Sequence, residues 1–532
     1  MVLFSLLYIV ALAYVYLFKF DIVVKRTNGA RWPHFVYGFL LLQAGFAGSL
    51  TDSPTLIWLV VLIVGAISIF RKRKSWDTLE SHMHHEGQKQ DLRNAYGAKG
   101  WATEQDIFNR LGDDSGLNIG NHINWYEHGH MLTVGGSGAG KGVNLIIPAL
   151  LSHGTTVCGM SLVVLDPKGE NAAITAPHFK NQGYDVHVIN PFHIPQIAHL
   201  GNSRWNPFDC IEPHEVKKMC DVLAYSLHNR TGGNDGSFFD NKCRQYIALY
   251  MRYAYHTGNK SMNWVYKKLM LTGIKRAEFI KEMRDDDNFS GQQEADNIYN
   301  ALLGETAKTE ENIFGTIQEA INILGDDALR ESMASSDFNL QDLPRKKMII
   351  YICIKHDELR YYAPWVRMFT DFLLKTLTTH FNPERKIIIL LDEFAQLGYV
   401  NEFKNSPAVL RGYNVTLWPI VQELGQLKSL YGDHWETFIS NATIKHWLGG
   451  GMDNTTAEYF ERRMPMDIKF VGSNADGSPR EVQTKLMTAA EIISSDKIIL
   501  EIARLDKPVK LDKMPYYTDK YIKDKAAPNP FR

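Results

Sequence analysis

The chain has 532 residues, of which 45% are hydrophobic and 22% are charged, and its formal net charge is −1. This length allows a membrane anchor together with two or three further domains. The near-neutral charge excludes nucleic-acid binding through an overall basic excess, so any such binding must come from a local arrangement of charges. The five cysteines form no CxxC pair and follow no metal-ligand spacing, which indicates a packing role in a reducing compartment.

The N-terminal region is predicted to anchor the chain in a membrane. Residues 1–20 are nearly all apolar, and a second apolar region, 35–70, is divided at 51–54 into two runs of helical length. Each run is slightly short for a membrane span, but tilting or local thinning accommodates that. The first segment has neither a basic n-region nor a small-residue cleavage site, which argues against a cleaved signal peptide. Basic residues in the first loop and at 71–74 favour three spans in an anchor of residues 1–74, and two spans remain an alternative.

A glycine-rich loop lies within "LTVGGSGAGKGVNLIIPALL" (132–151), between a predicted strand and a predicted helix. Its G-x-x-x-x-G-K spacing, ending at Lys141, is that of a phosphate-binding loop, whose backbone N–H groups point at an anion. Gly142 stands where a Ser or Thr hydroxyl normally reaches Mg²⁺. The alternative is a flexible glycine turn. The predicted nucleotide-binding residues are Gly135, Gly136, Ser137, Gly138, Ala139, Gly140, Lys141 and Gly142.

Two adjacent acids follow the apolar, β-branched run 387–391, which is typical of a central parallel strand. Asp392 is predicted to hold Mg²⁺, directly or through water, and Glu393 to orient or deprotonate the attacking water. Because Gly142 offers no ligand, Ser137, Asp392 and water are expected to share the metal, which Mg²⁺ tolerates. The alternative is a solvated strand end.

Short β-rich runs alternate with helical segments after the anchor, which predicts an α/β fold with a parallel sheet. Between about Asp209 and Leu343 the strands disappear and apolar residues recur at helical spacing, which indicates an inserted all-helical domain. The predicted strands are 130–134, 162–165, 186–189, 347–354, 387–391, 415–421 and 443–448. The predicted domains are an anchor (1–74), a nucleotide-binding domain in two parts (75–208 and 346–505), the helical insertion (209–345) and an extended tail (506–532).

Several motifs in one order resemble those of TraG-type coupling proteins, the membrane-anchored ATPases of bacterial conjugation and type IV secretion. The resemblance covers roughly 95–517. That family commonly carries GKG in place of GKS or GKT, so Gly142 is not a damaged site by its standard. The anchor departs from the family, which usually has two spans. The motifs are "AYGAKGWAT" (95–103), "GGSGAGKGVNLIIPALL" (135–151), "LVVLDPKGENAAITA" (162–176), "NPFDCI" (206–211), "LLDEFAQLG" (390–398) and "VQELGQLKSLYG" (421–432).

The resemblance implies a RecA-like P-loop ATPase that uses ATP and Mg²⁺ and assembles as a homo-hexamer around a central channel. It implies a multi-pass protein of the bacterial inner membrane with its soluble part in the cytoplasm. Its partners would be the components of a type IV secretion channel, and its cargo relaxase-bound single-stranded DNA, effector proteins or both.

Three further sites follow from these motifs. Arg411 matches an arginine of the family, and we expect it to act across a subunit interface as an arginine finger; a surface or capping arginine is the alternative. Gln422 ends the strand 415–421 at the edge predicted to hold the phosphates, which suits a γ-phosphate sensor, although an ordinary loop glutamine remains possible. The motif Asp166-Pro-Lys168-Gly-Glu170 is either a salt-linked turn or a nucleotide contact.

No residue is assigned to DNA contact from the sequence. The aromatic residues considered for base stacking have no interleaved basic residues, so a core role is expected for them. They are Trp101, Trp205, Phe238 and Phe239. Besides an ATP-driven coupling motor, two functions stay open: a nucleotide-regulated substrate receptor without motor activity, and a DNA translocase resembling FtsK. The long linker and C-terminal winged-helix segment of the latter are missing.

Overall fold

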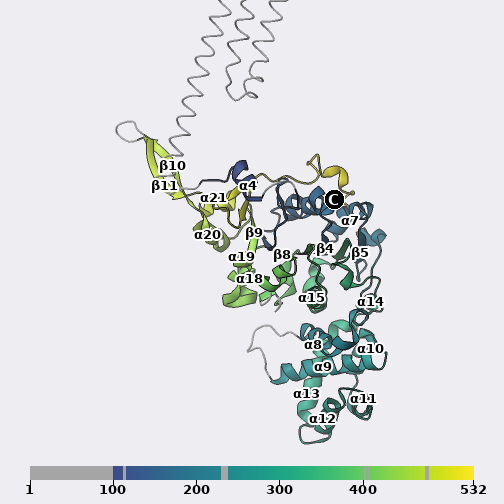
Figure 1. The fold of residues 1–532 in the computed structure, drawn as a ribbon. Coiled ribbons are helices and arrows are strands. Elements are labelled where there is room, and N and C mark those ends of the chain that lie inside the picture. The colour runs from purple at the N-terminus through teal and green to yellow at the C-terminus, as the bar shows by residue number, and fades with distance from the viewer. Residues whose placement is uncertain are drawn as a thin grey trace, which may run out of the picture. The chain divides into compact units, whose positions relative to one another are not determined.

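A computed structural model describes residues 100–531, with internal gaps at 112–114, 229–237, 401–402, 405–406 and 474–478. A sheet of nine strands runs through it, in the order β13-β12-β9-β3-β8-β7-β4-β6-β5 (Figure 1). The seven strands from β9 to β5 are parallel to their neighbours, whereas β12 and β13 are antiparallel at one edge. The mostly parallel α/β fold predicted from the sequence is therefore confirmed.

Every strand expected from the sequence is present, with small changes of its ends. The strands are β1 (Leu117–Asn118), β2 (Asn124–Trp125), β3 (His130–Gly135), β4 (Ser161–Leu165), β5 (Asp185–Ile189), β6 (Met348–Ile352), β7 (Ile387–Leu391), β8 (Val415–Val421), β9 (Ala442–Leu448), β10 (Met466–Ser473), β11 (Pro479–Lys485), β12 (Ile498–Ile502) and β13 (Val509–Leu511). Short antiparallel pairs form between β1 and β2 and between β10 and β11.

The sheet is apolar on both faces because side chains alternate along each parallel strand. On β7, Ile387, Ile389 and Leu391 belong to one buried cluster, and Ile388 and Leu390 to the other. Helices cover both clusters, and all five residues of β7 are buried. Because both neighbours of β7 hydrogen-bond to its backbone, the strand is held in place, and so are the two residues that follow it, Asp392 and Glu393.

Helices surround the sheet, and a group of them lies between β5 and β6 in the chain. The helices are α4 (Glu104–Leu111), α5 (Ile147–Leu151), α6 (His153–Val157), α7 (Glu170–Asn181), α8 (Val216–Leu227), α9 (Phe238–His256), α10 (Met262–Leu269), α11 (Gly273–Arg284), α12 (Gln292–Leu303), α13 (Ala307–Ala320), α14 (Asp327–Ser332), α15 (His356–Thr379), α17 (Pro407–Gly412), α18 (Leu424–Tyr431), α19 (Glu436–Asn441), α20 (Asn454–Arg463) and α21 (Ala489–Ser494).

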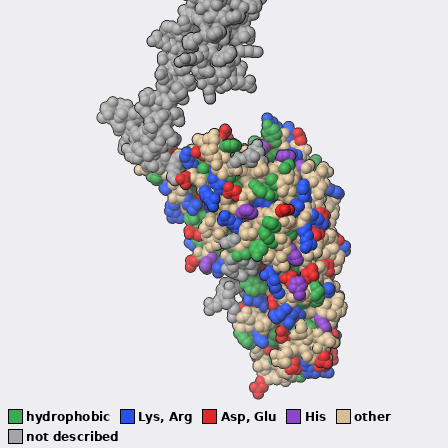
Figure 2. Space-filling view, in the orientation of Figure 1, with side chains coloured by type: hydrophobic (Ala, Val, Ile, Leu, Met, Phe, Trp, Pro, Cys, Tyr) green, Lys and Arg blue, Asp and Glu red, His purple; other side chains and the backbone are tan. Residues whose placement is uncertain are grey.

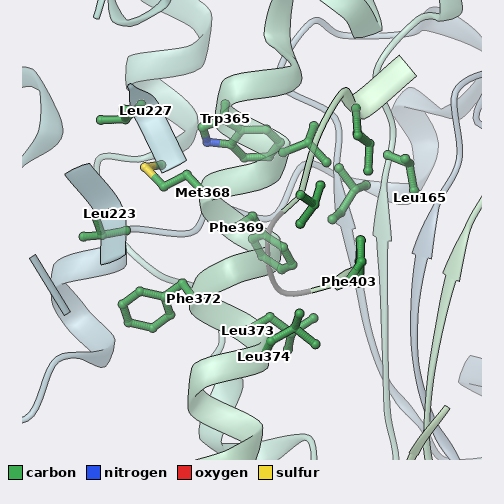
Figure 3. Close-up of a cluster of buried hydrophobic side chains, with 14 of the residues drawn as sticks. Leu165, Leu223, Leu227, Trp365, Met368, Phe369, Phe372, Leu373, Leu374 and Phe403 are labelled. Carbon is green, nitrogen blue, oxygen red and sulfur yellow. The ribbon is translucent and has the colours of Figure 1, made fainter. Parts of the chain in front are cut away.

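The inserted helices form a bundle at the end of the molecule away from β9 and β10 (Figure 1). Helix α15 connects this bundle to the sheet, since Met368 and Phe372 face Leu223 and Leu227 of α8 while Phe369 lies toward the sheet (Figure 3). The aromatic residues behave differently from one another. Trp205 is buried, as expected, but Phe238 and Phe239 at the start of α9 are 64% and 46% exposed, so their predicted core role is wrong.

The C-terminal segment packs on two helices, one that follows the glycine-rich loop and one that follows the Asp-Pro-Lys-Gly-Glu motif. Tyr516 donates its backbone N–H to the carbonyl of Val143, and Ala527 donates to that of Ile174. The side chains of Tyr516 and Ile522 are buried in a cluster with those of Ile147 and Ile174. The tail expected at 506–532 thus contains strand β13 and, as far as 531, lies against the domain.

The predicted location in the bacterial inner membrane is wrong for the part of the chain that the structure describes. None of the helices between 100 and 531 is long and apolar enough to cross a membrane. The longest of them, α15, carries charged residues in its first turn and an apolar face that is buried between the sheet and α8. The apolar segments of 1–74, on which the prediction rested, lie outside the described residues.

Candidate functional site

The glycine-rich loop connects β3 to a π-helical turn, Gly142–Ile146, that continues into α5. The backbone of the loop demands glycine at two kinds of position. Gly140 has a φ of +84°, which side chains rarely adopt. A Cβ at Gly136 would lie 2.1 Å from the carbonyl oxygen of Gly451. The glycines are therefore required by the shape of the loop, which leaves its N–H groups at the N-terminus of a helix, where an anion binds.

Lys141 lies over the loop from which it comes. Its Nζ donates hydrogen bonds to the carbonyl oxygens of Gly135, at 2.8 Å, and Gly136, at 3.4 Å. These neutral partners leave the ammonium charge uncompensated, so an entering phosphate would gain a charged hydrogen bond. At Gly142 a Cβ would meet nothing within 4 Å, so a side chain would fit there. The absence of a Ser or Thr hydroxyl at position 142 is therefore not explained by lack of space.

The acids after β7 form a bonded group with the end of β8. Gln422 donates its side-chain amide to both carboxylate oxygens of Glu393, at 3.0 and 3.3 Å. Asp392 Oδ1 accepts the backbone N–H of Glu393 at 3.1 Å. Glu393 has a φ of +54°, a left-handed conformation that costs a non-glycine residue about 1 kcal/mol or more. Such strain is retained where the surrounding structure fixes it, and it often marks a functional residue.

Burial raises the pKa of Asp392 to about 6, with the neighbouring Glu393 carboxylate adding to the rise. The positive charges of Lys141 and Lys168 act in the opposite direction. A buried carboxylate beside a second carboxylate is stabilised by a further cation, so Asp392 suits Mg²⁺. Among the described residues no group of three or more His, Cys, Asp or Glu side chains could hold a metal ion. The donors fit a metal held by Asp392, water and phosphate, with the exposed Ser137 as a further hydroxyl.

The Asp-Pro-Lys-Gly-Glu motif follows β4, whose Leu165 pairs in register with Leu391 of β7. Asp166 is 1% exposed and accepts the backbone N–H of Ala172 at 2.8 Å, so it fixes the start of α7. Burial is the first cause that raises its pKa to about 7, and the charge of Asp392 is the largest electrostatic one.

The other two charged residues of the motif have different surroundings. Glu170 accepts a hydrogen bond from Asn529 of the C-terminal segment at 2.7 Å, whereas Lys168 is exposed. Of the two interpretations left open by the sequence, a turn is present, but among the described residues Asp166 and Glu170 are held by hydrogen bonds and not by the predicted salt link. Lys168 is the member that stays exposed, and its charge acts on Asp392.

Arg411 lies away from this group. It is exposed near the end of α17, four residues before β8 begins, whereas Gln422 follows the last residue of the same strand. Within one chain Arg411 therefore belongs to the amino edge of the sheet and the phosphate loop to its carboxyl edge. The structure brings Lys141, Asp392, Glu393 and Gln422 to one edge, and it does not bring Arg411 there.

A second glycine loop borders the site and was not recognised in the sequence. Gly449, Gly450 and Gly451 follow β9, and the last two have φ values of +83° and +87°. The carbonyl of Gly451 touches the phosphate loop at Gly136. Three consecutive glycines directly after an apolar strand were the available signal, because glycine at a strand end marks a close backbone approach.

The model of the family described as type IV secretory system conjugative DNA transfer matches residues 86–531. Protein VirD4 of Rhizobium rhizogenes is 25% identical over 428 residues, which cover 76% of this chain and 61% of the relative. Conjugal transfer protein TraG of Escherichia coli is 26% identical over 345 residues, which cover 60% of this chain and 52% of the relative. The chain thus spans between about half and three-fifths of the length of these curated relatives.

Solved structures with a similar fold include the unbound bacterial conjugative coupling protein TrwBdeltaN70. It has a TM-score of 0.62 and 14% sequence identity, and the match covers 80% of this chain and 95% of that chain. The plasmid coupling protein TrwB in complex with ADP and Mg²⁺ gives a TM-score of 0.61 at 15% identity, over 79% of this chain and 94% of that one. At such identities the likeness establishes the fold.

Proposed function

This chain belongs to the type IV secretory system conjugative DNA transfer family, and we propose that it is an ATP-driven coupling protein. In this proposal it receives relaxase-bound single-stranded DNA, effector proteins or both, and drives or licenses their transfer into a type IV secretion channel. The observation that carries it is one sheet edge that joins a glycine-built phosphate loop to a strained acid held by a glutamine amide.

The residues of that edge divide the work of ATP hydrolysis. The loop 135–142 would hold the phosphates through its N–H groups, and Lys141 would exchange its carbonyl partners for phosphate oxygens. Mg²⁺ would neutralise charge on the phosphates, with Asp392 and Ser137 as its nearest protein oxygens. Glu393 would take a proton from the attacking water. TrwB, which has a similar fold, has been solved with ADP and Mg²⁺ and supports this assignment.

Gln422 is proposed as the sensor of the γ-phosphate. Its amide now donates to Glu393, and a phosphate oxygen would compete for the same N–H group. Exchange of that hydrogen bond would free the Glu393 carboxylate when ATP is bound. The state of the site would then reach β8, whose last residue, Val421, directly precedes Gln422.

Arg411 and the hexamer form the second part of the proposal. Because Arg411 lies at the amino edge of its own sheet, it can reach a γ-phosphate only in a neighbouring copy. A ring of six copies would place each phosphate loop against the Arg411 of the next subunit, with the cargo in the central channel. The Arg411 guanidinium would then stabilise the charge of the transition state.

Steady-state ATP hydrolysis by the purified chain, with and without single-stranded DNA, tests the proposed function. The wild type is expected to hydrolyse ATP faster when DNA is present. Lys141→Ala is expected to lose turnover by about 100-fold or more, because removing one charge-stabilising donor from such a site costs that much. Lys428→Ala, which removes an exposed lysine of α18, is the matched control and should behave as wild type.

Two results would reject the coupling motor. Hydrolysis by Lys141→Ala equal to that of the control would show that ATP is not turned over at this loop. ATP binding without any hydrolysis, in the presence and absence of DNA, would instead favour a nucleotide-regulated receptor.

A further inference from the structure

A second polar pocket lies near β12 and is separate from the phosphate loop. Its volume is about 230 Å³. It is formed by the loop after β12, the end of α20 and one side chain of β9, and its residues are Lys445, Arg463, Met464, Pro465, Glu501, Ile502, Ala503, Arg504, Leu505, Asp506, Lys507 and Pro508. Because β12 is antiparallel to β9 and Ile502 pairs with Ile444, the loop after β12 lies toward the amino edge of the parallel strands. The nucleotide edge is at the other end.

Lys445 of β9 contributes a mostly buried side chain to this pocket. Its side chain is only 10% exposed. The nearest acid, Glu501, lies 3.9 Å away, too far for a hydrogen bond, and already binds Arg463 at 2.7 and 3.2 Å. No other described residue accepts a hydrogen bond from the ammonium group of Lys445. The ammonium nitrogen itself is accessible to solvent in the pocket, so water or a ligand there can accept its hydrogen bonds.

Arg504 adds a second cation at the mouth of the pocket. It has a φ of +67°, although it is not glycine, and its side chain is exposed. In the described part of the chain its guanidinium forms no hydrogen bond or ion pair. Two further cations of this region are already paired, since Lys507 binds Asp106 and Arg110 binds Glu127. Lys445 and Arg504 are thus the pocket cations that form no hydrogen bond with a carboxylate, although Lys445 lies 3.9 Å from Glu501 and Asp506 also lines the pocket.

The walls of the pocket indicate which part of a ligand it takes. Apart from the charged residues they are aliphatic, with Met464, Pro465, Ile502, Leu505 and Pro508, and no aromatic side chain is present to stack a base. Two cations beside aliphatic walls suit a phosphate group that binds without any contact to a nucleobase. Contacts to the backbone phosphates of nucleic acid have this character, because they position a strand and carry no sequence information.

We propose that this pocket binds a backbone phosphate of single-stranded DNA between Lys445 and Arg504. The proposal rests on the proposed function, because it specifies where the transferred strand is held. Lys and Arg side chains are visible on this flank of the molecule, below the base of the β10–β11 hairpin (Figure 2). Since the net charge of the whole chain is −1, a local site of this kind is what DNA binding requires.

Strand β9 connects the two sites. Lys445 lies in the middle of the strand, in register with Leu132 of β3. The glycine loop after the strand touches the phosphate loop at Gly136 through the carbonyl of Gly451. Strand β9 therefore contacts both the DNA phosphate and the nucleotide loop, and it offers a direct route by which bound DNA could change the rate of hydrolysis.

Binding of a fluorescent single-stranded oligonucleotide to the full chain tests the pocket. The variant Lys445→Met, Arg504→Gln is compared with Lys510→Gln, Lys520→Gln, which removes two exposed lysines outside the pocket and so matches it in charge. We expect the pocket variant to bind about tenfold more weakly. The slope of log Kd against log salt concentration should fall by about 0.7, since the pocket holds one phosphate and each lost phosphate contact on a single strand contributes about 0.7. The control should keep the wild-type slope.

Equal losses in the two variants, or no loss in the pocket variant, would overturn the proposal. So would a pocket variant that binds the oligonucleotide as wild type but no longer binds vesicles of anionic phosphatidylglycerol, because the ligand would then be a lipid headgroup. ATP turnover measured without DNA reports separately on the proposed function. If the chain hydrolyses no ATP but shows the expected change in DNA affinity, the proposal for the pocket stands and the proposed motor activity is rejected.

A second measurement needs no variant. Burial lowers the pKa of Lys445, which increases the neutral, reactive fraction of its amine, and an acetylating reagent can reach that amine only through the open pocket. We expect the oligonucleotide to protect Lys445 from acetylation of the wild-type protein, as read by mass spectrometry, while Lys510 stays reactive. Protection by millimolar inorganic phosphate but not by the oligonucleotide would overturn the proposal in favour of a free anion.

Discussion

The charged groups at the carboxyl ends of the parallel strands differ in their bonding from those at the amino ends. At the carboxyl edge they bond to one another or to the backbone: Gln422 holds Glu393, Asp166 holds the start of α7, and Lys141 bonds to its own loop. These contacts keep the groups in place before any ligand arrives. A ligand must then replace bonds that already exist, which favours selectivity for a group as strongly charged as a triphosphate.

At the amino edge several cations have no acid of their own. Lys386, which begins the approach to β7, is 1% exposed, donates to the carbonyl of Glu127 at 2.5 Å and lies 3.7 Å from the centre of the Trp125 ring. Arg411 is exposed, and among the described residues its guanidinium forms no hydrogen bond or ion pair, while its backbone carbonyl accepts the N–H of Asn414. An edge of this kind is complete only when an anion from outside the chain meets it, whereas the carboxyl edge is organised by itself.

The sharpest way to break this comparison is to test whether Arg411 of one copy completes the carboxyl edge of another. Arg411→Ala is expected to lower ATP turnover by about 1000-fold with little change in ATP affinity, because an arginine finger acts on the transition state. Turnover and nucleotide affinity are measured on the same preparations. Arg360→Ala, which removes an exposed arginine of α15, is the control and should change neither.

Mixed assemblies decide whether Arg411 acts in trans. Subunits with Arg411→Ala and subunits with Lys141→Ala are each inactive, but one order of neighbours joins an intact loop to an intact arginine. Mixing them should restore part of the activity. If mixed rings, verified by mass, stay as inactive as either parent, the trans role is wrong, unless turnover requires every site. A dilution of wild type with Arg411→Ala subunits would reveal that exception as a steeply concave loss.

Within the carboxyl edge, the bond between Gln422 and Glu393 sharpens the comparison further. Glu393→Gln should lower turnover by about 100-fold and leave ATP bound, because it removes a general base and keeps the shape. Gln422→Ala should lower it less, about tenfold, and the double variant should be no worse than Glu393→Gln alone. Glu458→Gln, on the exposed side of α20, is the control. Additive losses in the double variant would mean that Gln422 acts on something other than Glu393.

The carboxyl edge was predictable from the sequence because each of its parts is a contiguous motif after an apolar strand. The phosphate loop, the acid pair and the end of β8 are each read within a few residues, and parallel strands bring their carboxyl ends to one edge. The bond between Gln422 and Glu393 was not predictable, because it depends on side-chain conformations and on the left-handed backbone of Glu393.

The amino edge and the pocket were missed for a physical reason. Glu501 and Arg504 lie on or just after β12, an antiparallel edge strand that the sequence did not predict, whereas Lys445 lies on the predicted strand β9, and no short motif joins the three. Strands β12 and β13 are short; the first was not predicted within the nucleotide-binding part 346–505, and the second fell in the predicted tail. The exposure of Phe238 and Phe239 was missed similarly, because an apolar start to an amphipathic helix does not reveal whether its first turn is covered.

Two glycines of the phosphate loop, Gly136 and Gly142, test with a smaller expected effect how far ATP binding depends on the close packing of this loop. Gly136→Ala would bring a Cβ to 2.1 Å from the Gly451 carbonyl, so the loop must shift. We expect about tenfold weaker ATP binding, measured by titration calorimetry. Gly142→Ala meets nothing within 4 Å and should bind ATP as wild type, since alanine is also the better helix former. Equal weakening in both variants would mean that Gly142 is needed for contact with the nucleotide itself.

The last prediction uses pH to distinguish the edges without any ligand. Burial lowers the pKa of Lys386 to about 7, against about 10.4 in the unfolded chain. Between these values the unfolded chain holds the proton and the folded one does not, so the stability that this residue contributes rises with pH and is lost as pH falls through 7. Asp166 has the opposite sign: its pKa is raised to about 7, so its contribution is present below about pH 4 and is lost as pH rises to 7.

Above pH 7 Lys386 of the amino edge should therefore make the stability rise with pH. Between pH 7 and pH 8 the free energy of unfolding is expected to rise by about 1 kcal/mol from Lys386, which is close to the limit for one titrating group. Denaturant unfolding of wild type and Lys386→Met at the two pH values measures it as a difference of differences, so that other titrating groups cancel. Lys347→Met removes a lysine that is less buried and should keep the wild-type pH dependence. If Lys386→Met keeps it too, the ammonium stays charged in the fold, held by the Trp125 ring and the Glu127 carbonyl, and the amino edge is as self-sufficient as the carboxyl edge.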